Sequence, residues 1–260
     1  MPPRRRRERR VFAPFADLLA AVEEQAITRF SSIEAHFIAA MGAFDTEIAR
    51  PGGQWTSGDN QGKGKFFNEL TAALLQNLTG QPIIQRGKRP GVLLDNVDVD
   101  LCFPLDGAPL VIAETKMLGT PQHPRNETSQ HIRGRRSTAD LPKRIREIAL
   151  NVIDLKLAAP AGRAEPIGDI ATWIQRQSPA FYALFGLRVA DDYDHEQLVA
   201  QAQMLSNSYA NGVGLVLYRP TDISTPVGRT TYARVRPPRG LALDDALARM
   251  AREITASTNR

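Results

Sequence analysis

Two neighbouring segments decide the fold of this chain: Asn96-Val97-Asp98-Val99-Asp100-Leu101-Cys102-Phe103 and Leu110-Val111-Ile112-Ala113-Glu114-Thr115-Lys116. Both are rich in β-branched and other apolar residues, which predicts two strands. The Asp106-Gly107 pair between them predicts a tight hairpin turn. Because Leu110 to Ala113 is apolar without interruption, we expect the second strand to be covered on both faces.

Charged side chains occupy defined faces of these two strands. Side chains alternate between the faces of a strand, so we expect Asp98 and Asp100 on one face, with Val99 and Leu101 on the other. By the same rule, we expect Glu114 and Lys116 on the second strand to share a face with Leu110 and Ile112.

The hairpin predicts a charged cluster at one end of the sheet, formed by Asp100, Glu114 and Lys116. Two carboxylates and an ammonium are costly to bury there without a purpose. Asp100 and Glu114 offer half of the oxygen shell that Mg²⁺ prefers. Lys116 is suited to orienting a water and to stabilising charge on a phosphate.

Outward from the hairpin, apolar periodicity predicts helices within 13–49, 65–79, 141–155, 194–209 and 243–254. Further short strands are expected at 82–84, 213–218 and 229–235. We expect 117–139 to be a long loop, and 158–192 to hold only a short helix around Ile170 and Trp173 between prolines and glycines. This order predicts an α/β fold with a sheet between two layers of helices.

Asp100, a spacer of 13 residues and Glu114-Thr115-Lys116 resemble the PD-(D/E)xK nuclease superfamily. The resemblance implies a restriction-endonuclease-like, three-layer α/β/α core with a mixed sheet. It also implies Mg²⁺, for which Mn²⁺ can substitute, held by Asp100 and Glu114. Glu69, on the helix before the sheet, matches a further acidic position of that family.

The chain departs from the family pattern in two respects. The family's proline-aspartate pair is absent, and Asn96-Val97-Asp98-Val99-Asp100 stands in its place. The first metal ligand is therefore either Asp98 or Asp100, and we favour Asp100 because it lies deeper in the strand. The Gln-x-x-x-Tyr signature of the RecB-like branch is also missing.

The resemblance implies a cytoplasmic, Mg²⁺-dependent DNA endonuclease, similar to type II restriction enzymes that cut duplex DNA as homodimers. The alternatives are a low-specificity defence or repair nuclease, a nuclease subunit that needs a partner, and a non-catalytic DNA-binding protein with a nuclease-like core.

A second acid-x-lysine triplet, Asp154-Leu155-Lys156, lies on the helix predicted over 141–155. Residues two apart on a helix point about 200° from each other, so these side chains cannot converge. We interpret them as part of a solvated helix face.

Basic residues follow the Glu-x-Lys strand and are candidates for phosphate contacts. The candidates are Arg133, Arg135, Arg136, Lys143 and Arg144. Arg86 and Lys88 form a second basic patch, which we place on the loop before the aspartate strand.

Composition bounds the remaining possibilities. Residues 1–10 hold six arginines and one glutamate, and so account for the whole net charge of +5. We predict a disordered basic tail over 1–12, a helical segment over 13–60 and the nuclease-like domain over 61–260. No apolar run approaches the roughly 18 residues of a membrane span. A lone cysteine excludes a disulfide framework, and Gly62-Lys63-Gly64-Lys65 lacks the rest of a nucleotide-binding loop.

Overall fold

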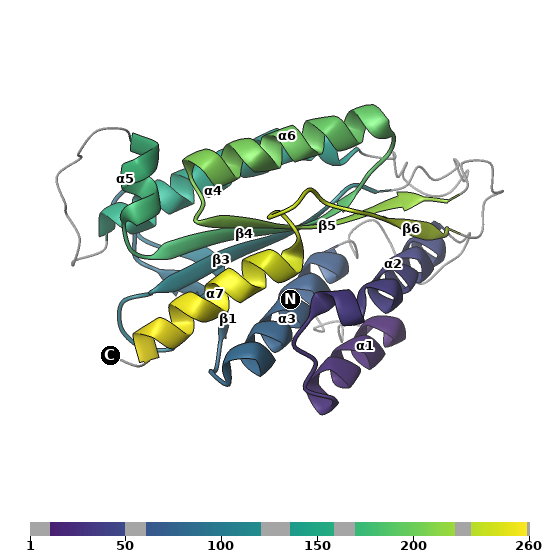
Figure 1. Ribbon diagram of the computed structural model, residues 1–260, viewed down its shortest axis with the longest axis horizontal. Helices are drawn as coiled ribbons and strands as arrows, with labels where there is room; N and C mark the ends of the chain where they lie inside the picture. Colours follow the sequence, from purple (N-terminus) through teal and green to yellow (C-terminus); the bar gives the residue numbers. More distant parts are fainter. Residues whose placement is uncertain (1–10, 50–60, 121–135, 159–169, 222–229, 259–260) are drawn as a thin grey trace, which may run out of the picture.

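The computed structural model describes residues 11–49, 61–120, 136–158, 170–221 and 230–258. Its centre is a six-stranded mixed sheet with helices on both sides, as Figure 1 shows. Helices α4, α5 and α6 cover the upper face in that view, and α1, α2, α3 and α7 lie below. The α/β fold predicted from the element order is therefore confirmed.

The sheet runs in the order of the sequence, from β1 to β6. Its strands are β1 (Ile84–Arg89), β2 (Val97–Phe103), β3 (Val111–Leu118), β4 (Ala180–Arg188), β5 (Gly212–Pro220) and β6 (Tyr232–Val235). The β1–β2, β2–β3 and β5–β6 pairs are antiparallel, whereas β3–β4 and β4–β5 are parallel. The parallel strands lie in the middle, where helices cover both faces.

Most of the helices pack against the sheet, whereas α1 packs on α2 and α3, and α5 packs on α6. They are α1 (Ala13–Glu24), α2 (Glu34–Ala49), α3 (Gln61–Thr79), α4 (Ser137–Ala158), α5 (Ile170–Arg176), α6 (Asp192–Ser208) and α7 (Leu243–Thr258), with a 3₁₀ turn at Phe30–Ser32. The lower core joins α1 and α2 to α3 and α7, and a separate upper core lies under α4 and α6. The first two helices thus share a core with the later part of the chain.

The strand β4 is the main element that the sequence analysis missed. It lies between β3 and β5 and is buried along almost its whole length. We had expected only a short helix in 158–192, and that helix is present as α5. The apolar run from Ala180 to Leu187 is typical of a strand covered on both faces, but the prolines and glycines around it obscured the signal.

The basic patch at 85–89 is also placed differently from the prediction. These residues form most of the edge strand β1, not a loop. The helix α3 begins at Gln61, four residues before its predicted start. It ends at Thr79, as predicted, and the next residue, Gly80, has a φ of +66°.

The predicted alternation along β2 fails at Asp100. Val97 and Val99 belong to the upper core, whereas Leu101 and Phe103 belong to the lower core. The expectation that Val99 and Leu101 share a face was therefore wrong. Arg86 lies opposite Asp100 on β1, and its φ of +54° places it in the left-handed region. Both strands are thus irregular at the same point, and because the β1–β2 register is the same on either side of it, neither strand has an inserted residue.

The interpretation of Asp154 and Lys156 as solvated was wrong as well, because both side chains are buried. The Asp154 carboxylate accepts backbone N–H groups from Val92, Leu93 and Leu94 at 2.5, 2.6 and 3.1 Å. The Lys156 ammonium donates in another direction, to carbonyl groups at the end of α5 and to Asn211. Burial lowers the pKa of Lys156 to about 8. As predicted, the two side chains do not converge. Asp154 holds the segment between β1 and β2, and Lys156 holds the end of α5 and the residues just after it.

Among the described residues, no helix combines the length and the apolar character that crossing a membrane requires.

Replacing Asp154 with alanine should lower the free energy of unfolding by about 2–3 kcal/mol, because three partly buried N–H groups lose their acceptor. Urea denaturation followed by circular dichroism measures this loss. Asp17→Ala on the exposed face of α1 is the matched control, with an expected change within about 0.5 kcal/mol. An equal, small effect of both substitutions would show that the carboxylate does not hold the 92–94 backbone.

Candidate functional site

The site begins where β2 and β3 stop pairing. The recorded register pairs Phe103 with Val111 and ends with Leu101 opposite Ala113. Beyond that pair, the backbone N–H of Thr115 is bound by the Asp100 side chain, at 2.8 Å from Oδ2. A carboxylate thus takes the place of a backbone acceptor, as a buried N–H group requires.

Lys116 joins the two strands at this point. Its Nζ lies 2.9 Å from Asp100 Oδ2 and 2.6 Å from Glu114 Oε2. The Glu114 side chain is only 5% exposed, whereas Lys116 and Asp100 are 24% and 28% exposed. The predicted convergence of these three residues is therefore present, and one side of the cluster is open to solvent.

Two asparagines, which the sequence analysis did not single out, support the cluster from the two helical layers. Asn151 on α4 donates its amide to Glu114 Oε1 at 3.0 Å. Asn68 on α3 donates to the backbone carbonyl of Asp100 at 3.0 Å and lies 3.4 Å from the Thr115 hydroxyl. One signal was available: Asn151 is a polar residue beside the apolar stripe of its helix.

Burial and charge act against each other in the cluster. Burial raises the pKa of Glu114, and Lys116 opposes that rise. For Lys116, burial alone would lower the pKa, but Glu114 and Asp100 outweigh it and the pKa rises above its ordinary value. The lysine is therefore an ammonium at neutral pH, and it is shared by two acidic side chains.

The other acidic candidates lie apart from this cluster. Glu69 pairs with Lys65 on the same helix at 3.3 Å. Asp98 is 87% exposed and lies 4.0 Å from Lys88. Of the two aspartates left open by the sequence, Asp100 is the one in contact with Glu114 through Lys116.

The candidate DNA-contacting residues fall into three groups. Arg133 and Arg135 lie outside the described residues. Arg136 pairs with Asp191 at 2.7 Å, and Arg144 with Glu147 at 2.6 Å. The remaining three are exposed on β1 and α4: Arg86, Lys88 and Lys143.

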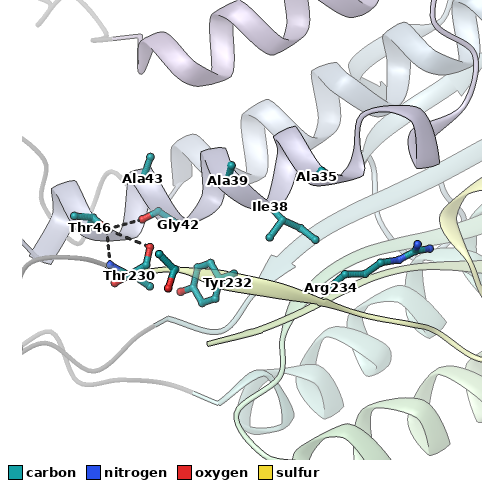
Figure 2. Close-up of a pocket in the computed structure, with 10 residues that line it drawn as sticks. Ala35, Ile38, Ala39, Gly42, Ala43, Thr46, Thr230, Tyr232 and Arg234 are labelled. Carbon is teal, nitrogen blue, oxygen red and sulfur yellow. Dashed lines mark hydrogen bonds between the residues drawn. The ribbon is translucent and has the colours of Figure 1, made fainter. Parts of the chain in front are cut away.

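A pocket of about 640 Å³ lies elsewhere, between α2 and the strand β6. Figure 2 shows Arg234 at one end of it and Thr46 beside Thr230 at the other. Arg234 is paired with Glu34 at 2.8 Å, and Thr46 is hydrogen-bonded to Thr230 at 2.7 Å. Ile38, Tyr232 and small side chains line the rest, so this pocket offers little chemistry.

The cluster contains two carboxyl groups, the ligand type that a hard cation prefers. Within the described part of the chain, no group of three or more His, Cys, Asp or Glu residues is placed to hold a metal ion. Two carboxylates suffice for Mg²⁺, which usually keeps several waters and takes other ligands from a phosphate.

Compared with known proteins, the chain matches no family model, no curated protein and no solved structure. An assignment of function to this protein therefore rests on the geometry of the cluster and on the sequence pattern.

Lys116→Met should lower the free energy of unfolding by about 2 kcal/mol at neutral pH, because two partly buried carboxylates then face each other without a counter-charge. Adding Glu114→Gln should recover most of that loss, which a double-mutant cycle in urea measures as a coupling. Lys143→Met, at an exposed lysine, is the control and should change stability by less than about 0.5 kcal/mol. Strictly additive effects would mean that the ion pairs do not form.

Proposed function

We propose that this protein is a metal-dependent endodeoxyribonuclease whose active centre is formed by Asp100, Glu114 and Lys116. The observation that carries the proposal is their convergence: one ammonium lies within hydrogen-bonding distance of carboxylates from two strands. Phosphodiester hydrolysis needs a cation site, an activated water and a positive charge near the phosphate. This cluster offers the ligands for the first and the side chain for the last.

The element order supports a restriction-endonuclease-like core. A helix, three antiparallel strands and a helix follow one another as α3, β1, β2, β3 and α4, and a further strand, β4, comes after the short helix α5. This is the order that the resemblance to the PD-(D/E)xK superfamily implies. The acidic residues and the lysine also lie on the strands that the resemblance assigns to them.

The donor set suits Mg²⁺. Asp100 Oδ2 and Glu114 Oε2 both contact the Lys116 ammonium, so the cluster has two acidic groups and one basic group. Asp100 and Glu114 are therefore the residues that would hold the ion. When bound, Mg²⁺ supplies Lewis-acid activation of the phosphate and of the attacking water.

The chain's own residues orient the reacting groups. The Thr115 N–H and the Asn151 amide each occupy one carboxylate oxygen, which fixes Asp100 and Glu114 in place. The Lys116 ammonium stabilises the negative charge that builds up on the phosphate as the water oxygen bonds to phosphorus. The ester bond on the opposite side of the phosphorus then breaks. The attacking water gives up one proton and the leaving oxygen takes one up, so that the products are a phosphomonoester and an alcohol.

The proposed substrate is duplex DNA, and the proposed assembly is a homodimer, as in the type II restriction enzymes that the sequence pattern resembles. Light scattering at working concentration tests the dimer. Digestion of long defined DNA tests specificity: discrete bands support a restriction enzyme, whereas a smear supports a low-specificity nuclease.

Cleavage of mixed plasmid and phage DNA in Mg²⁺ tests the activity directly. EDTA should abolish it, and Glu114→Gln and Lys116→Ala should each lower the rate by about 10²–10⁴-fold, because each removes a charge that acts on the phosphate or its cation. Gel electrophoresis of the products measures the rates.

Glu147→Gln on α4 is the matched control for Glu114→Gln. Its carboxylate is 40% exposed and paired with Arg144, so the rate should stay within about threefold of the wild type. A well-folded wild-type protein that cuts none of these DNAs would contradict the proposal. Cleavage that survives both active-centre substitutions would place the activity elsewhere in the chain.

A further inference from the structure

Three consecutive large apolar side chains are exposed in the turn between β1 and β2. Val92, Leu93 and Leu94 are 58%, 64% and 40% exposed. Isolated apolar residues on a surface are common, but an exposed apolar cluster marks an interaction site. Among the described residues, this turn holds the one run of three consecutive exposed large apolar side chains, and it is therefore a candidate contact surface.

The backbone of the turn is held from beneath. All three N–H groups donate to the buried carboxylate of Asp154, and the Gly91 N–H donates to the Leu94 carbonyl at 3.0 Å. A Cβ at position 91 would collide with the Asp154 carboxylate, so only glycine fits there. The backbone of the turn is thus held in place with its N–H groups directed inward, while the apolar side chains are exposed.

The turn is anchored close to the proposed active centre. Asp154 lies three residues beyond Asn151 on α4, which is about 4.5 Å along the helix axis. Asn151 is the residue that holds Glu114. The turn and the carboxylate of Glu114 are thus connected through less than one turn of the same helix.

Basic residues precede the turn along β1. The segment from Gln85 to Leu94 contains Arg86, Lys88 and Arg89 and no acidic residue. The Arg86 and Lys88 side chains are exposed, and Asp98, at 4.0 Å from Lys88, opposes part of this charge. Cations of this kind contact phosphates, and apolar side chains beside them can enter the base stack.

We propose that Val92, Leu93 and Leu94 form an apolar wedge that inserts between base pairs of the duplex bound at the active centre. Arg86 and Lys88 contact the phosphates on either side of the opened step. This inference rests on the proposed function, and it adds that the enzyme unstacks its DNA near the site of cleavage. A rigid backbone suits that task because the energy of binding is not spent on ordering the turn.

A duplex that already contains a weak step tests the wedge without knowledge of a recognition sequence. The probe is a 30-base-pair DNA with one central unpaired base and 2-aminopurine beside it; the reference is the fully paired duplex. In EDTA, which prevents cleavage, the wild type should bind the probe about 10-fold more tightly, because part of the unstacking is already present. Binding should also raise the 2-aminopurine fluorescence at least twofold.

Leu93→Ser should remove both the preference and the fluorescence rise while the protein still binds paired DNA. Leu93→Met, which keeps an apolar side chain of similar size, should restore them. Leu105→Ser is the matched control: Leu105 is 47% exposed in the turn at the other end of β2. It should behave as the wild type in both measurements.

The outcomes separate the wedge from the nuclease. Binding and Mg²⁺-dependent cleavage without any preference or fluorescence rise would overturn the wedge and leave the nuclease intact. Failure to bind or cut any DNA would overturn both. If Leu93→Ser instead converts a dimer to a monomer in light scattering, the turn is a contact between two copies of the chain, and the wedge is wrong.

Discussion

The pairing of β2 with β3 ends at Leu101, and the side chain of Asp100 takes over as acceptor for the next part of β3. A buried N–H group requires a partner, so the strands can separate there only because a carboxylate fills the gap. At the same point, the odd-numbered side chains of β2 change from the upper core to the lower core, and Arg86 on the neighbouring strand has a left-handed backbone. The irregularity of the sheet and the position of the charged cluster thus have one origin.

Electrostatics explains why this arrangement is tolerated within a largely apolar sheet. Two carboxylates compete for one ammonium, and α4 supplies an uncharged donor, Asn151, in place of a second cation. A second lysine or arginine would neutralise the site and weaken its attraction for a divalent ion. The surplus of one acidic group over the single ammonium therefore favours the binding of a cation.

The sequence predicted what local patterns can encode. The Asp-Gly hairpin, the strands on either side of it and the amphipathic helix that became α4 follow from turn chemistry and periodicity, and so does the meeting of Asp100, Glu114 and Lys116. It could not predict the change of face at Asp100, which depends on where two strands part. Asp154 was misread for a related reason: its partners, the N–H groups of Val92 to Leu94, lie about 60 residues away and carry no sequence signal. The strand β4 was different, because its apolar run was visible and was overlooked among prolines.

The anchoring of the 91–94 turn has a consequence for how this protein can diversify. Asp154 binds backbone N–H groups, which every residue except proline provides. These hydrogen bonds therefore do not depend on which side chains stand at positions 92, 93 and 94. Only Gly91 and Asp154 are constrained by the contact itself. Mutations in this stretch can change the shape presented at the surface with little effect on folding. Because the stability of the turn does not depend on its exposed side chains, related chains or a designed library can vary these side chains to bind new partners.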